Sequence, residues 1–222
     1  MLVTKLKFIS SPTERTTAIT DILLALAAGG AVIYLQCSES HEIWKINTWS
    51  RAFALIALAG FLGAIAHGLE LTEAHHRRIW HVINLSLGLS VSIFVIGVAY
   101  DLWGLAFARK MLPWMIGCAL LFLGVTRLFA GIFFVFILYE ATALLFAFAA
   151  YGWLSITDQL NGATLMAAGV LASVIAAGIQ ASKKMNLKLV FEFDHNGIFH
   201  IVQILGIFLL VAGLKASLLP DS

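Results

Sequence analysis

Long apolar runs separated by short charged segments constrain this chain more than any other feature. Hydrophobic residues fill 61% of its 222 positions and charged residues only 12%, so charge is about half as frequent as in a soluble domain. Runs of roughly 20 apolar residues are long enough to cross a bilayer as helices. The sequence therefore predicts one all-α transmembrane domain over residues 1–222, a polytopic bundle of seven transmembrane helices. The expected helices lie near 17–36, 49–72, 79–100, 111–127, 130–154, 161–182 and 196–218.

The apolar run from Met111 to Leu154 needs a break, because a single helix of that length would be about twice as long as the hydrocarbon core is thick. Arg127, followed by Gly131, is the charged point at which a hairpin can turn without leaving an ion in lipid. We therefore expect Arg127 to face water or headgroups. Elsewhere, small residues such as Gly60 and Gly63 predict close packing between helices.

The distribution of Lys and Arg predicts the orientation of the bundle. With seven crossings, nine of these cations fall on the amino-terminal side and five on the other side, and cytoplasmic loops carry the excess of positive charge. The nine are Lys5, Lys7, Arg15, Arg77, Arg78, Arg127, Lys183, Lys184 and Lys188, and the five are Lys45, Arg51, Arg109, Lys110 and Lys215. We expect a plasma-membrane or inner-membrane protein with a cytoplasmic amino terminus.

The small net charge bears on the partners of the chain. A formal charge of +2, dispersed between spans, is too weak for a nucleic-acid surface. We therefore expect membrane lipids as partners and no nucleic acid.

Polar side chains that a membrane interior should not contain gather at one side of the expected bundle. Ionisable groups within spans are expensive, so each is a candidate for function. Odd-numbered helices start, and even-numbered helices end, on the amino-terminal side, so four helices bring polar groups to a similar depth there. These groups are Asp21 from the first helix, His67 and Glu70 from the second, His81 and Asn84 from the third, and Asp194, His195, Asn196, His200 and Gln203 from the seventh.

The histidines of this cluster predict a metal site. Imidazole is the commonest metal ligand in proteins, and its second nitrogen is often held by a carboxylate. His67, an isolated imidazole on an apolar helix, and His200 are expected to share one ion, with His81 or His195 as the third ligand. Asp21 or Asp194 is then expected to hold a ligand in place or to carry a proton, which makes them the candidate catalytic residues.

The start of the seventh helix is the densest part of the cluster. Asp194 is placed to cap this helix, which puts His195 in the first turn. At 100° per residue, His195 then points about 140° away from His200. The two histidines can share a site only if the first turn is irregular, and we favour His200.

Two further polar positions lie outside this cluster. Glu140 is about ten residues into the fifth expected helix, roughly 15 Å deep and near the bilayer midplane. We expect its carboxyl group to be protonated or paired, either in a proton relay or polar substrate contact, or in a structural bond to a neighbouring helix. The stretch His-His-Arg-Arg at 75–78 is expected to form a polar turn between the second and third helices.

A histidine late in the second helix and a histidine cluster at the start of the seventh resemble the CREST superfamily, which includes alkaline ceramidases and progestin and adiponectin receptors. The resemblance implies that zinc is held by His67 and by His200, which matches the last histidine of the family's HxxxH pair. Asn196 stands at the first position of that pair with His195 beside it, and Gly63 stands where the family has a serine. The resemblance also implies a lipid amide or ester as substrate, attacked by zinc-activated water.

Three functions follow from these patterns. The first is a zinc-dependent membrane hydrolase of a lipid amide or ester. The second is a non-enzymatic binding or transport protein, in which the polar cluster and Glu140 line a path for a small polar or protonated substrate. The third is a haem-binding membrane protein with axial ligands from His67, His81 and His200. Elemental analysis of the purified protein would separate them, because they predict zinc, no tightly bound metal and iron respectively.

Overall fold

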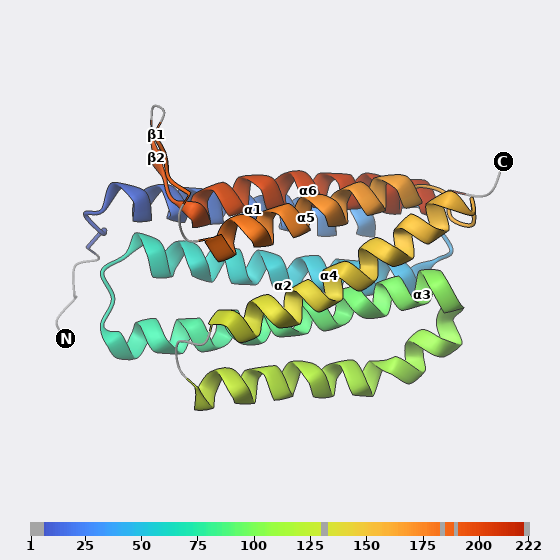
Figure 1. The fold of residues 1–222 in the computed structure, drawn as a ribbon, viewed down its shortest axis with the longest axis horizontal. Coiled ribbons are helices and arrows are strands. Elements are labelled where there is room, and N and C mark those ends of the chain that lie inside the picture. The colour runs from blue at the N-terminus through green and yellow to red at the C-terminus, as the bar shows by residue number, and fades with distance from the viewer. Residues whose placement is uncertain (1–6, 130–132, 183–184, 189–190, 220–222) are drawn as a thin grey trace.

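The computed structural model describes residues 7–129, 133–182, 185–188 and 191–219. Apart from one short two-stranded ribbon, the elements in these residues are helices (Figure 1). In chain order they are α1 (Pro12–Gln36), α2 (Ile43–Gly68), α3 (Glu73–Leu128), α4 (Phe133–Ile156), α5 (Ala163–Ser182), β1 (Leu187–Lys188), β2 (Glu192–Phe193) and α6 (His195–Ser217). The expected all-α class is confirmed. Within the described residues, six helices are long and apolar enough to cross a membrane.

Two helices begin at residues that the sequence marks as caps. Pro12 occupies the first position of α1, and the hydroxyl of Ser11 before it accepts a hydrogen bond from the backbone N–H of Glu14 (3.5 Å). Asp194 caps α6 as expected, because its Oδ1 accepts the backbone N–H of Gly197 (2.9 Å). These caps fix where α1 and α6 start at the same end of the bundle.

The helix α3 folds back on itself at Gly104. This residue has φ +76° and ψ 177°, a conformation that only glycine adopts without strain. Figure 1 shows the two arms of α3 running in opposite directions. Gly104 is the residue between them with non-helical backbone angles. The expected helices 79–100 and 111–127 both lie within α3, one in each arm.

The connection between α2 and α3 differs from the expectation. The helix α2 ends at Gly68 rather than near residue 72, so Glu70 lies in the connection, where it pairs with Lys7 (2.7 Å). The stretch 75–78 is not a polar turn, and that prediction was wrong. Thr72 caps α3 ahead of it, accepting the N–H of residue 75 (3.4 Å), so the polar stretch falls in the first turns of the helix.

The break expected after Arg127 coincides with a helix end. The helix α3 ends at Leu128, and α4 begins at Phe133. Arg127 is exposed in the last turn of α3. The expected turn residue Gly131 lies outside the described residues, as do three of the counted cations, Lys5, Lys183 and Lys184.

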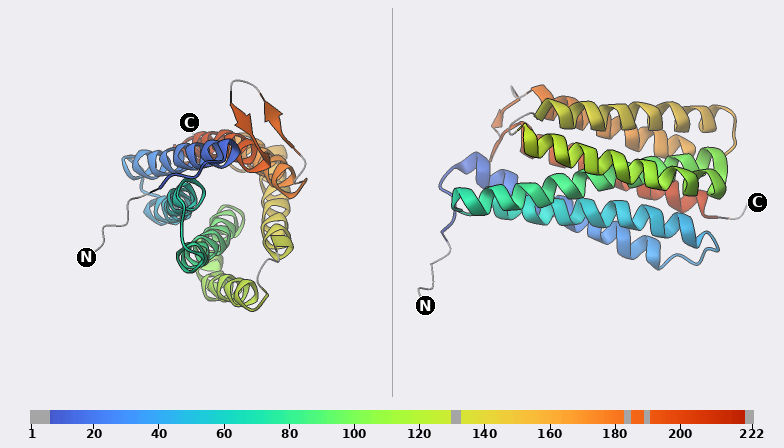
Figure 2. Two further views of the ribbon diagram at one scale, coloured as in Figure 1. Left: turned by 90° about the vertical axis from the view of Figure 1, so that its left-hand side faces the viewer. Right: turned by 90° about the horizontal axis from the view of Figure 1, so that it is seen from below.

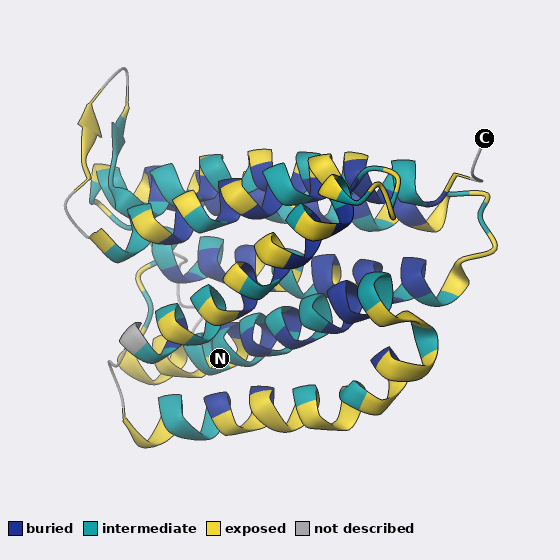
Figure 3. Cartoon of the chain, turned by 45° about the vertical axis from the view of Figure 1, so that its right-hand side comes forward, coloured by how far each residue is buried: buried dark blue, intermediate teal, exposed yellow. Residues whose placement is uncertain are grey.

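The helices form a ring. Each helix packs against the next one along the chain, and α6 packs back against α1. Figure 2 shows this ring from one end of the bundle. The second arm of α3 is exposed along most of its length (Figure 3). Large buried side chains, among them Trp49, Tyr151, Met166 and Ile207, fill the part of the ring away from the start of α1.

A buried ion pair joins three helices at the end of the bundle where α1 ends. Lys45 Nζ on α2 lies 2.6 Å from Asp101 Oδ1 on α3, with side chains 3% and 1% exposed, and the Tyr151 hydroxyl on α4 donates to Asp101 Oδ2 (2.9 Å). Lys45 was expected among the cations of the membrane surface, and that expectation was wrong, because its side chain is buried in this ion pair. Without Lys45, the excess of Lys and Arg on the amino-terminal side is larger.

The fold at Gly104 gives a testable prediction. Gly104→Ala should lower the free energy of unfolding by about 1–3 kcal/mol, because alanine is strained in that backbone conformation. Gly30→Ala on α1 is the control, since a Cβ at Gly30 meets nothing within 4 Å; it should change stability by less than about 1 kcal/mol. Denaturant unfolding followed by circular dichroism measures both. Equal free energies of unfolding for the Gly104→Ala and Gly30→Ala variants would contradict a turn at Gly104.

Candidate functional site

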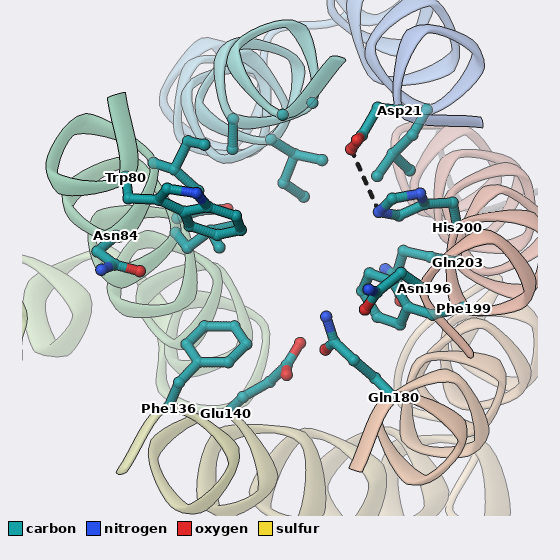
Figure 4. A pocket seen from close by; sticks show the side chains of 18 of the residues that line it. Asp21, Trp80, Asn84, Phe136, Glu140, Gln180, Asn196, Phe199, His200 and Gln203 are labelled. Carbon is teal, nitrogen blue, oxygen red and sulfur yellow. Dashed lines mark ion pairs between the residues drawn. The ribbon is translucent and has the colours of Figure 1, made fainter. Parts of the chain in front are cut away.

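A cavity of about 690 Å³ lies inside the ring, and all six helices contribute side chains to its wall (Figure 4). Its volume falls within the range of small-molecule sites. Several lining residues, including His76, Gln180 and His195, lie at helix ends, so the cavity extends to the end of the bundle where α1 begins. The remaining wall is largely apolar, with Ile83, Phe136 and others.

Most of the expected polar cluster comes together here. Its members that line the cavity are Asp21, His67, Asn84, His195, Asn196, His200 and Gln203. Glu140 on α4, which was expected near the membrane midplane, lines the same cavity. His81 and Glu70 are not among the described lining residues, and neither is Asp194, which caps α6 and accepts a hydrogen bond from Thr17 (2.9 Å).

Asp21 and His200 form a buried pair between α1 and α6. Nε2 of His200 lies 3.2 Å from Oδ1 of Asp21 (Figure 4), and the two residues are 7% and 4% exposed. Nδ1 of His200 lies 3.0 Å from the hydroxyl of Thr20, one residue before Asp21. Both ring nitrogens of His200 are therefore held by α1.

The direction of these hydrogen bonds defines the protons of the pair. The Thr20 hydroxyl donates its single hydrogen to the carbonyl of Thr17 (2.9 Å), so it can only accept from Nδ1 of His200. Nδ1 therefore carries a hydrogen, and the contact between Nε2 and Asp21 needs a second one, on either the imidazole or the carboxyl. Both arrangements leave the pair without net charge, which lowers the cost of burying it.

Glycines on α2 let α1 approach closely at this pair. A Cβ added to Gly63 would lie 2.7 Å from Asp21 Oδ1, and one added to Gly60 would lie 3.0 Å from the Asp21 carbonyl oxygen. The predicted role of these small residues in helix packing is confirmed. The missing side chain at Gly63 thus leaves room for the carboxyl group of Asp21.

His67 is held at the mouth of the cavity by residues of α1 and α3. Its Nδ1 lies 2.7 Å from Oε2 of Glu14, and its ring meets the indole of Trp80 edge to face, 5.8 Å between centroids. The Trp80 N–H in turn donates to Nε2 of His76 (3.1 Å). These contacts orient His67 without a metal ion.

Three buried oxygen atoms of lining residues have no hydrogen-bond partner among the described residues. They are Oδ2 of Asp21, Oε2 of Glu140 and Oε1 of Gln203, from α1, α4 and α6. Figure 4 shows Asp21 and Glu140 reaching into the cavity from different walls. A buried polar atom without a partner costs about 1–3 kcal/mol, so these atoms indicate a ligand or ordered water in the cavity.

The donor set does not fit the expected zinc site. Zinc takes three protein ligands even in an open catalytic site, and no three His, Cys, Asp or Glu side chains within the described parts of the chain are placed to hold one ion. His67 and His200 both line the cavity, but both ring nitrogens of His200 are already held by Thr20 and Asp21 of α1. A zinc ion shared by them stays a prediction that this geometry does not support.

Sequence reasoning missed several residues of the site, above all Thr17, Thr20 and Glu14. Thr17, Thr20 and Asp21 have the spacing i, i+3 and i+4, which places them on one face of a helix. That polar stripe on an otherwise apolar helix was a usable signal. Glu14 lay before the expected start of the first helix, so it was not considered as a site residue.

The close approach at Gly63 gives a second prediction. Gly63→Ala should destabilise the protein by about 1–3 kcal/mol, because the new methyl group forces Asp21 away from His200. Gly178→Ala is the control, since a Cβ there meets nothing within 4 Å. Thermal unfolding of both variants in the same detergent tests this, and an unchanged G63A variant would contradict the packing described at Asp21.

Residues 16–219 match a family described as a family of unknown function, DUF6962. No curated protein and no solved structure matches the chain. The matched range runs from the first turns of α1 through α6, so it includes every helix that lines the cavity. The chain belongs to the DUF6962 family.

Proposed function

We propose that the protein is a membrane binding or transport protein that takes a small cationic molecule into the cavity. The three buried oxygens without partners carry this proposal, because all of them line one space and all of them accept hydrogen bonds when the carboxyls are ionised. A ligand with several N–H donors would satisfy them together.

The charges around the cavity favour a cation. Its described lining residues include two carboxyl groups, Asp21 and Glu140, but no Lys and no Arg. An anion would therefore find no fixed positive charge, whereas a cation can pair with Glu140, a carboxyl group that forms no ion pair with any described residue, in an apolar and weakly screening environment. Trp80, Phe136 and Phe199 line the same space and offer aromatic faces to a cation or to the apolar part of the ligand.

This function is the second of the three expected from the sequence. Binding or transport requires only that polar groups and Glu140 line one space, which the cavity provides. Hydrolysis by zinc requires a set of three ligands, and haem binding requires axial histidines that face the cofactor. Of the histidines expected as haem ligands, His81 is not among the described lining residues.

We further infer that α3 crosses the membrane twice, once on each side of Gly104, so that the chain makes seven crossings. Each arm exceeds or matches the roughly 20 residues that a crossing needs. The count of Lys and Arg favours a cytoplasmic amino terminus in a plasma or inner membrane. The cavity then opens toward the cytoplasm, because its polar end lies where α1 begins.

The topology is open to a direct test. Reporter fusions should place the amino terminus in the cytoplasm and the carboxyl terminus across the membrane, because an odd number of crossings separates the two ends. A fusion in the connection between α2 and α3 should report the cytoplasm. Both ends on one side would contradict seven crossings.

A pair of matched probes tests the proposed ligand class. Benzylguanidinium carries a positive charge and several N–H donors, and benzylurea has nearly the same shape without the charge. The protein in lipid nanodiscs should bind benzylguanidinium at least about tenfold more tightly than benzylurea, because a charge pair in an apolar cavity contributes more than about 1.4 kcal/mol. Isothermal titration calorimetry measures both affinities.

Variants locate the binding site of the cation. Asp21→Asn and Glu140→Gln should each weaken the binding of benzylguanidinium at least about tenfold and leave the weak binding of benzylurea unchanged. Glu73→Gln is the control, because Glu73 is exposed in the first turn of α3 and is not among the lining residues. Equal affinities for the two probes, or no binding of either, would contradict the proposal.

A further inference from the structure

We propose that a cation entering the cavity displaces one proton from Glu140, so that the site exchanges a cation for a proton. This inference rests on the proposed function and specifies how its charge is balanced. It follows from a difference between the two carboxyl groups of the cavity: Asp21 has an internal partner for its charge, whereas no ion pair joins Glu140 to any described residue.

Asp21 is neutralised within the protein. Its contact with His200 contains one proton, and the pair carries no net charge wherever that proton lies. The other oxygen of Asp21 can therefore accept a hydrogen bond from a ligand without any change in the charge of the pair. Asp21 positions the cation but does not need to release a proton.

None of the described groups that face Glu140 forms an ion pair with it. The titratable groups that line the cavity from the other helices are Asp21 on α1, His67 on α2, His76 on α3, and His195 and His200 on α6. The described lining residue of α5 is the uncharged Gln180. His67 and His200 are bonded to Glu14 and Asp21 respectively, so neither can also neutralise Glu140.

The space behind Glu140 offers no counter-ion either. A second cavity of about 70 Å³, large enough for about two water molecules, shares Glu140 and Gln203 with the main cavity. Its other described walls are mostly apolar, with Trp49 and Phe53 among them, and Glu140 is its one titratable lining residue. An ionised Glu140 between these two spaces would be an uncompensated charge in an apolar interior.

Glu140 is therefore neutral while no cation is bound and becomes ionised when one binds. In the exchange, the O–H bond of the Glu140 carboxyl group breaks, its electron pair stays on the carboxylate, and the proton leaves through water in the main cavity. The carboxylate then pairs with the cation. One positive charge enters and one leaves, so the net charge of the cavity does not change.

Proton release during binding tests this exchange. Benzylguanidinium is the probe, because a guanidinium group stays fully charged at neutral pH and cannot itself supply the proton. In a weakly buffered suspension of protein in nanodiscs with a pH indicator, saturating probe should release about one proton per bound molecule. The Glu73→Gln control should release the same number per molecule bound. Glu140→Gln should release none.

Infrared difference spectra give a second readout that does not depend on folding of the Glu140 variant. Binding to the wild-type protein should remove one carbonyl band, which belongs to the protonated carboxyl group of Glu140. The frequency of this band should shift in D₂O. Binding of the probe without proton release, or release that persists in E140Q, would overturn the exchange and leave the proposed function standing. A folded wild-type protein that binds no probe would overturn the proposed function itself.

Discussion

A carboxyl group inside an apolar helix bundle needs a cation, a proton or hydrogen-bond donors, because the surroundings screen its charge weakly. In this bundle the partners come from other helices. Asp101 on α3 is paired with Lys45 on α2 and bonded to Tyr151 on α4, and Asp21 on α1 is paired with His200 on α6. Each pair is stable only while its helices stay adjacent, so charge neutralisation helps to set which helices are neighbours in the ring.

The two pairs lie at opposite ends of the bundle and have different surroundings. Around Lys45 and Asp101, large buried side chains such as Trp49 and Tyr151 fill the ring. Around Asp21, small residues of α2 such as Gly60 and Gly63 bring α1 close and also line the cavity. The glycines that permit the close helix contact thus also form part of the cavity wall beside the polar pair.

Hydropathy and the alternating direction of successive helices made part of the fold and of the site predictable. The apolar runs located the helices, Arg127 marked a helix end, and the alternation of direction along the chain brought Asp21 and His200 to the same end of the bundle. Polar residues inside helices hid the true starts of α2 and α3, since Lys45 and the stretch 75–78 resemble connecting segments. Pair partners could not be predicted, because hydropathy does not specify the rotation of each helix about its axis.

The proposed exchange of a proton for a cation at Glu140 would have a consequence for transport. To carry a ligand across the membrane, the ring must open at the end now closed by the Lys45–Asp101 pair. A cavity with an ionised, unpaired Glu140 would meet a large electrostatic penalty during that change, because its charge would be enclosed in apolar surroundings. A cavity that holds either the proton or the cation is neutral at Glu140 and avoids the penalty. The same constraint that pairs Asp21 and Asp101 within the protein would thus couple outward movement of one cation to inward movement of one proton.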